Sequence, residues 1–252
     1  MKNYLKILIA FMLVLAICQT NAQAQGVKGV FNKTKEAVNK ATKKEVAKST
    51  GTKGADKESP SAGPAKPLAP EVKNSVSEIR AMTGLTKDAF IAKMKSQGFV
   101  ESQDEFGMSG TIYKSKSKGY LLAVEFGTRG NAEFVRSVSK GIASKTPNFG
   151  TIKTTFLDLG KQCINLKATY SGGFLKAINS KNSVKNVRNA EERTSKFLPA
   201  FDTMIGAKEE GGAVDQYSEK DYDYNINYTY AKGMGSIITI QVTDLTIESM
   251  FG

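Results

Sequence analysis

The sequence DYDYNINYTY, at residues 221–230, alternates between polar and apolar side chains without interruption. Successive side chains of a strand point to opposite faces, so this pattern predicts a strand with one aromatic face and one polar face. A glycine-containing turn follows at 231–235, and Ile238, Ile240 and Val242 then share one face of residues 236–243. We therefore predict an antiparallel hairpin over residues 221–243.

The aromatic face of this hairpin is the first candidate binding surface. Four phenol rings on one strand face give rigid, amphipathic contact area, which suits recognition of a protein or a glycan. The alternative is that the rings pack beneath helices as part of the core. The candidate ligand-binding residues are Tyr222, Tyr224, Tyr228 and Tyr230.

The polar face of the same strand carries Asp221, Asp223, Asn225 and Asn227. Alternate residues of a straight strand lie about 7 Å apart, which is too far for them to share one calcium ion. We therefore expect a solvated polar face and no metal site.

Outward from the hairpin, helical and strand patterns alternate through residues 75–252. A helix capped by Gly84 or Thr86 is predicted to end at Gly98. A second helix is predicted over 190–205, and Pro199 either kinks this helix or marks its true start. Strands are predicted at 110–116, 120–126, 132–139 and 162–170, whereas 154–159 fits either a strand or a helix. Residues 174–187 are expected to be irregular or a short helix.

Both halves of this region show a helix, a glycine-marked loop and then antiparallel strands. The predicted fold class is therefore α+β, with helices packed on an antiparallel sheet and arranged as two tandem helix-plus-meander units. This order resembles exported inhibitor and adaptor domains of the β-lactamase-inhibitor type. The resemblance concerns the architecture and implies no shared ligand.

Residues 1–24 have the pattern of a cleavable signal peptide. Lys2 and Lys6 precede an apolar run at residues 7–17, and Ala22-Gln23-Ala24 offers a cleavage site before Gln25. The end of this segment, NAQAQ at 21–25, resembles the signal ends of exported proteins from the Bacteroidota. We expect a periplasmic or secreted protein, and the alternative is a lipoprotein anchored at Cys18.

A basic segment and a linker are predicted for residues 25–74, which hold eleven lysines against five acidic residues. Residues 27–48 have helical periodicity, and 49–70 are too poor in large apolar side chains to form a core. The basic stretch is either an attachment site for an anionic membrane surface or a solvated tether. Because it lacks arginine, nucleic acid is not an expected partner. The candidate attachment residues are Lys28, Lys33, Lys35, Lys40, Lys43 and Lys44.

The chain contains no histidine and two cysteines, of which one precedes the predicted cleavage site. This composition excludes a Ser-His-Asp triad, a Cys-His pair and histidine-ligated zinc within one chain. Cys163 is expected to be a small buried residue of a strand. The leading hypothesis is a non-enzymatic binding domain of the cell envelope, without a cofactor. The alternatives are a structural envelope protein and a hydrolase that draws paired carboxylates from Asp215, Glu219 and Asp221.

Overall fold

The computed structural model describes residues 72–102, 111–115, 117–178 and 183–250. The predicted signal peptide, Cys18, the basic segment with its six candidate lysines and the predicted linker lie outside the described residues.

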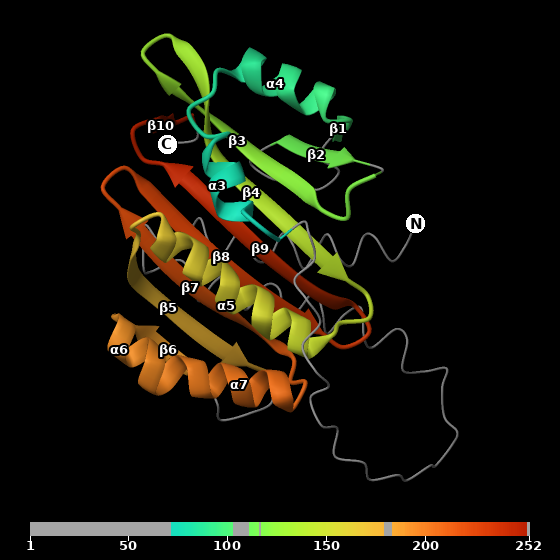
Figure 1. The fold of residues 1–252 in the computed structure, drawn as a ribbon, viewed down its shortest axis with the longest axis vertical. Helices are drawn as coiled ribbons and strands as arrows, with labels where there is room; N and C mark the ends of the chain where they lie inside the picture. Colours follow the sequence, from blue (N-terminus) through green and yellow to red (C-terminus); the bar gives the residue numbers. More distant parts are fainter. Residues whose placement is uncertain (1–71, 103–110, 116, 179–182, 251–252) are drawn as a thin grey trace. The chain divides into compact units, whose positions relative to one another are not determined.

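The described residues contain one antiparallel sheet of ten strands, in the order β1-β2-β3-β4-β9-β8-β7-β5-β6, with β10 pairing to β3. Figure 1 shows the long central strands side by side, from green β3 and β4 to orange and red β8 and β9. The predicted α+β class is confirmed at this level. The strands are β1 (Phe99–Ser102), β2 (Thr111–Ser115), β3 (Leu121–Arg129), β4 (Ala132–Ser144), β5 (Thr169–Ala177), β6 (Val184–Val187), β7 (Gly211–Glu219), β8 (Tyr222–Ala231), β9 (Gly235–Asp244) and β10 (Glu248–Ser249).

The predicted hairpin is confirmed as β8 and β9, whose register pairs Tyr224 with Val242 and Ile226 with Ile240. A second long-range pairing joins β9 to β4, from Ser137 opposite Thr243 to Ser144 opposite Ser236. We call this pairing the β4–β9 seam. It makes one continuous sheet of strands that lie far apart in the sequence.

Six helical segments accompany the sheet in the described part of the chain. The predicted cap is confirmed, since the Thr86 side chain accepts a hydrogen bond from Ala89 N at the start of α4. Gly98 follows α4 with φ 75°, a left-handed conformation that glycine adopts without strain. The helices are α3 (Ser75–Arg80), α4 (Lys87–Ser96), α5 (Phe149–Asn165), α6 (Ala190–Glu192), a π-helical turn η3 (Arg193–Phe197) and α7 (Leu198–Gly206).

Two predictions for the middle of the chain are wrong. The strand expected at 162–170 begins only at Thr169, because Gln162 and Cys163 belong to α5. The apolar residues Ile152, Phe156, Leu159 and Cys163 recur with a helical period and are buried. Residues 174–187, expected to be irregular or a short helix, contain the last four residues of β5 and all of β6 instead.

The predicted helix over 190–205 is confirmed, since α6, η3 and α7 follow one another without a gap from Ala190 to Gly206. Pro199 lies in the first turn of α7, directly after the π-helical turn, and therefore falls at an irregularity inside the helical run and not at its start. The residues before it form α6 and the wider turn of η3.

The hydrophobic core combines one face of the central strands with apolar side chains of α3, α4, α5 and α7. Phe201 of α7 lies edge to face with Tyr228 of β8, at a centroid distance of 5.8 Å. Phe201 also contacts Phe156 of α5, at 4.6 Å between ring centroids. The helices of the second half thus meet each other and the aromatic face of β8 in one cluster.

Candidate functional site

The tyrosine row of β8 lies on the face that contributes to the core. Tyr224 and Tyr228 are 0% and 1% exposed, whereas Tyr222 and Tyr230, at the ends of the row, are half-buried. The Arg80 guanidinium lies 4.3 Å from the Tyr222 ring centroid, and Phe149 lies 5.1 Å from that of Tyr230. The two central rings are therefore packing residues here, and only the two ends of the row offer contact area to a ligand.

The opposite face of the same strands carries a compact set of polar side chains, which we call the polar grid. Two cross-strand rows form it: Ser218 pairs with Asp223, which pairs with Thr243, and Gln216 pairs with Asn225, which pairs with Gln241. All six residues are half-buried and alternate with the fully buried Tyr217, Tyr224 and Val242. The grid is about 10 Å wide across three strands and about 7 Å along them. The polar grid comprises Gln216, Ser218, Asp223, Asn225, Gln241 and Thr243.

Side-chain hydrogen bonds order part of the polar grid. Gln216 Nε2 donates to Asn225 Oδ1 at 2.9 Å. Gln241 Nε2 and Thr243 Oγ1 both donate to Ser137 Oγ on β4, at 2.9 and 3.3 Å. Because these bonds tie neighbouring strands together, the amides are held in fixed orientations before any ligand binds.

The solvated polar face predicted for β8 is correct only in part. Asp221, Asp223 and Asn225 are partly exposed, but Asn227 is 2% exposed and donates from Nδ2 to Thr239 Oγ1 of β9 at 3.2 Å. The return strand β9 was predicted as the hairpin partner of β8, but the partners on β7 and β4 were not, because pairing between distant strands is not visible in a single sequence. The alternation of residues 238–243 is the signal that indicates the β9 side chains of this face.

Asp223 is the charged member of the polar grid. Burial raises the pKa of its carboxyl above the ordinary value of 3.8, with no other cause. Its partners across the strands are Ser218 and Thr243, which are neutral. Among the described residues, no lysine or arginine forms an ion pair with it.

A buried ionic cluster lies on the core side of β7. Asp215 is 0% exposed, and its Oδ2 accepts hydrogen bonds from Arg193 Nε at 2.8 Å and Tyr217 Oη at 3.5 Å. Arg193 Nη2 approaches the same oxygen at 2.6 Å, from the first residue of the π-helical turn. Burial raises the pKa of the Asp215 carboxyl, and Arg193 opposes that rise. The cluster therefore links η3 to β7 through a desolvated ion pair.

Tight packing surrounds this ionic cluster. A Cβ at position 160 would lie 2.5 Å from Tyr217 Oη, and one at position 173 would lie 2.5 Å from Tyr170 Oη. Glycine at both positions therefore makes room for the two phenol hydroxyls beside Asp215. Cys163 is free and buried nearby, and burial together with the charge of Asp215 raises the pKa of its thiol to about 12.

Asp215 and Glu219, two of the three carboxylates considered for hydrolysis, are not arranged as a catalytic pair. Asp215 and Glu219 are four residues apart on β7, which places their Cα atoms roughly 13 Å from each other. Glu219 Oε1 pairs with Arg80 Nη2 at 2.8 Å and accepts a hydrogen bond from Tyr224 Oη. Glycosidases need carboxyl groups about 5 to 9.5 Å apart, so this pair does not fit that chemistry. In the described ranges no three His, Cys, Asp or Glu side chains are grouped so that they could hold a metal ion.

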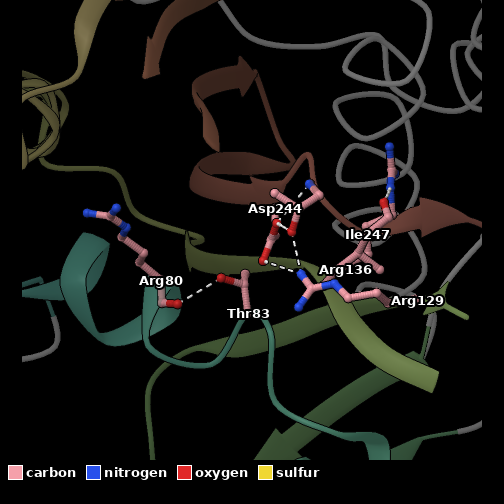
Figure 2. A network of polar contacts seen from close by, with 7 residues as sticks. Arg80, Thr83, Arg129, Arg136, Asp244 and Ile247 are labelled. Carbon is pink, nitrogen blue, oxygen red and sulfur yellow. Dashed lines mark hydrogen bonds and ion pairs between the residues drawn. The ribbon is translucent and has the colours of Figure 1, made fainter. Parts of the chain in front are cut away.

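A second polar network fixes the end of the described chain, as Figure 2 shows for Asp244, Arg129 and Arg136. Asp244 Oδ1 accepts from Thr246 N at 2.9 Å, and its Oδ2 lies 3.8 Å from Arg129 Nη2. Arg136 Nε donates to the carbonyl of Ile247 at 3.1 Å. These contacts attach the segment after β9 to the β3–β4 hairpin. We therefore assign the network a role in stabilising the fold.

Comparison with models of known protein families finds no match to the chain, and neither do comparisons with curated proteins and with solved structures. Within the part of the chain that the structure describes, no helix is long and apolar enough to cross a bilayer.

Proposed function

We propose that the chain is a non-enzymatic binding module of the cell envelope, and that the polar grid is its recognition surface. The observation that carries this proposal is the grid itself: six half-buried polar side chains in register on β7, β8 and β9. Their amides and hydroxyls both donate and accept hydrogen bonds. A surface of this kind can satisfy the polar groups of a partner that covers it.

The chemistry of the grid supports a protein as the partner. Sites for small molecules are concave and lined mainly by hydrophobic and aromatic side chains. None of the six grid residues is aromatic, and the tyrosines of β8 point to the other face. Interfaces between proteins use hydrogen bonds spread over a broad area, which a sheet face provides.

The sheet order supports two tandem units as the origin of this broad face. The strands β1-β2-β3-β4 and β7-β8-β9 form two antiparallel meanders that meet at the β4–β9 seam. A helix precedes each meander in the chain, α4 in the first and α7 in the second. In this arrangement helices pack on the core side of the sheet, and the grid lies on the reverse side.

The sequence of the first 74 residues supports the location. A leader with a small-residue cleavage site and a lysine-rich segment suit a domain that is exported and then held by a basic tether. We propose attachment of that tether to an anionic membrane surface as a second role, for which the candidate residues are Lys28, Lys33, Lys35, Lys40, Lys43 and Lys44.

Site-specific photo-crosslinking tests the proposal. We suggest producing the full chain in its native host with p-benzoylphenylalanine at position 241, and a matched control at Thr203, an exposed residue of α7. We expect an adduct with a second protein from position 241 and none from position 203. Equal adducts from both positions, or none from either, would contradict recognition through the grid.

A further inference from the structure

Asp223 differs from the other acidic residues of β7, β8 and β9 in how its charge is compensated. Of the carboxylates on β7, β8 and β9, Asp215 pairs with Arg193, Glu219 with Arg80, and Asp244 with Arg129. Asp223 has no such partner among the described residues. Within the described ranges, three of these four carboxylates thus have an ion-pair partner, and the fourth, Asp223, lies on the polar grid without one.

We propose that the partner docks on the polar grid by placing a lysine or arginine side chain against the Asp223 carboxylate. This inference rests on the proposed function and adds to it the chemistry of the partner. A polar, cation-bearing protein surface complements one carboxylate surrounded by neutral hydrogen-bonding groups.

The neighbours of Asp223 suit such a cation. Ser218 and Thr243 lie directly across from it on β7 and β9, at Cα distances of about 4.5 to 5.5 Å. Their hydroxyl oxygens can accept hydrogen bonds from the same ammonium or guanidinium group that pairs with the carboxylate. In the other row of the polar grid, Gln216 and Asn225 are already hydrogen-bonded to each other. We therefore expect the cationic side chain of the partner to bind at Asp223 and not at this row.

An unpaired, partly desolvated carboxylate costs the free protein stability. Functional positions are where such costs are expected, because selection for binding maintains them. A neutral, isosteric side chain at position 223 should therefore improve folding and weaken docking. A residue with a purely structural role would not change both properties in opposite directions.

The test measures the yield of the position-241 adduct in the otherwise wild-type full chain and in three variants of it. Asp223→Asn should lower the yield at least about tenfold, and Asp223→Lys should abolish it. Asp202→Asn removes an exposed carboxylate of α7 that pairs with Lys153, and it should leave the yield unchanged. Acetylating lysines and blocking arginines of envelope extract before it is mixed with purified protein should lower the wild-type yield to that of Asp223→Asn.

The outcomes separate this inference from the proposed function. An adduct of wild-type yield in Asp223→Asn would overturn the inference and leave the binding function standing. Absence of any adduct in the wild-type background would overturn both. An adduct between position 241 and residues 25–74 of the same chain would also overturn the inference, since the basic segment would then occupy the grid.

Discussion

Asp215 and Asp223, on the neighbouring strands β7 and β8, differ in how their charge is compensated. Asp215 is fully buried on the core side and has Arg193 as its counterion. Asp223 is half-buried on the other side, with neutral neighbours. The two residues should therefore respond to substitution in opposite directions.

Asp223→Asn is expected to stabilise the folded chain at neutral pH. Burial raises the pKa of Asp223 in the folded state, so folding favours the protonated carboxyl and the ionised form is destabilising. The gain should be present above the folded-state pKa and vanish as the pH falls below about 3.8, the ordinary value. Urea unfolding of both proteins between pH 3 and 7 checks this, and a constant difference at all pH values would contradict it.

Asp215→Ala is expected to destabilise the fold by roughly 3–5 kcal/mol, because it leaves the Arg193 guanidinium without its counterion in a desolvated site. The matched control is Asp202→Ala, which removes an exposed pair with Lys153 and should cost about 0–1 kcal/mol. Urea midpoints and slopes measure both changes. Equal losses in the two variants would show that the Asp215 ion pair is not the source of the stability.

Cys163 should be inert in the native protein. Its thiol is buried and its pKa is raised to about 12, so the reactive thiolate is scarce at pH 8. We expect negligible reaction with a thiol reagent under native conditions and complete reaction in guanidinium. Rapid labelling of the native chain would contradict the buried position.

At the scale of elements, α5 depends on a glycine where most helices would prefer alanine. Gly→Ala in a helix interior usually stabilises by about 0.5–1 kcal/mol. At Gly160, however, the new Cβ would lie 2.5 Å from Tyr217 Oη. We expect Gly160→Ala to destabilise the protein by about 1–3 kcal/mol, as overpacking does.

Two further variants test this explanation of Gly160. Tyr217→Phe removes the hydroxyl, so in that background Gly160→Ala should cost much less. Gly206→Ala, at the end of α7, meets no atom within 4 Å and should be neutral or stabilising. Thermal unfolding of the wild type, Gly160→Ala, Tyr217→Phe and the double variant measures the coupling between positions 160 and 217. Equal effects of Gly160→Ala in the wild-type and Tyr217→Phe backgrounds would contradict the explanation.

The elements that the sequence predicts best are those with one clear period. The alternation of 221–230 predicted β8, and Thr86 and Gly98 predicted both ends of α4. Residues 162–170 misled the prediction because Cys163-Ile164-Asn165-Leu166 alternates briefly while also completing the apolar stripe of α5. Of the polar grid, only the β8 residues Asp223 and Asn225 could be predicted as neighbours on one face, since the other four residues join them through cross-strand pairing.

At the scale of the whole molecule, the β4–β9 seam makes the two meanders one cooperative unit. Eight residue pairs of the seam, from Ser137–Thr243 to Ser144–Ser236, connect the meanders. We expect the slowest-exchanging amides of β3 and β8 to share one free energy of opening. Hydrogen exchange followed by mass spectrometry measures this, and a clearly lower value for β3 would show that the first meander unfolds alone.

The same seam has a consequence for how the chain acquires its structure. Ser137 and Thr243 are separated by 106 positions, so the edge of β4 that pairs with β9 stays unpaired until β9 has been synthesised. An open edge of this kind can recruit strands from other molecules. A nascent chain would thus be prone to aggregate while β4 has been synthesised and β9 has not, and a chaperone that shields β4 during that interval would raise the yield of folded protein.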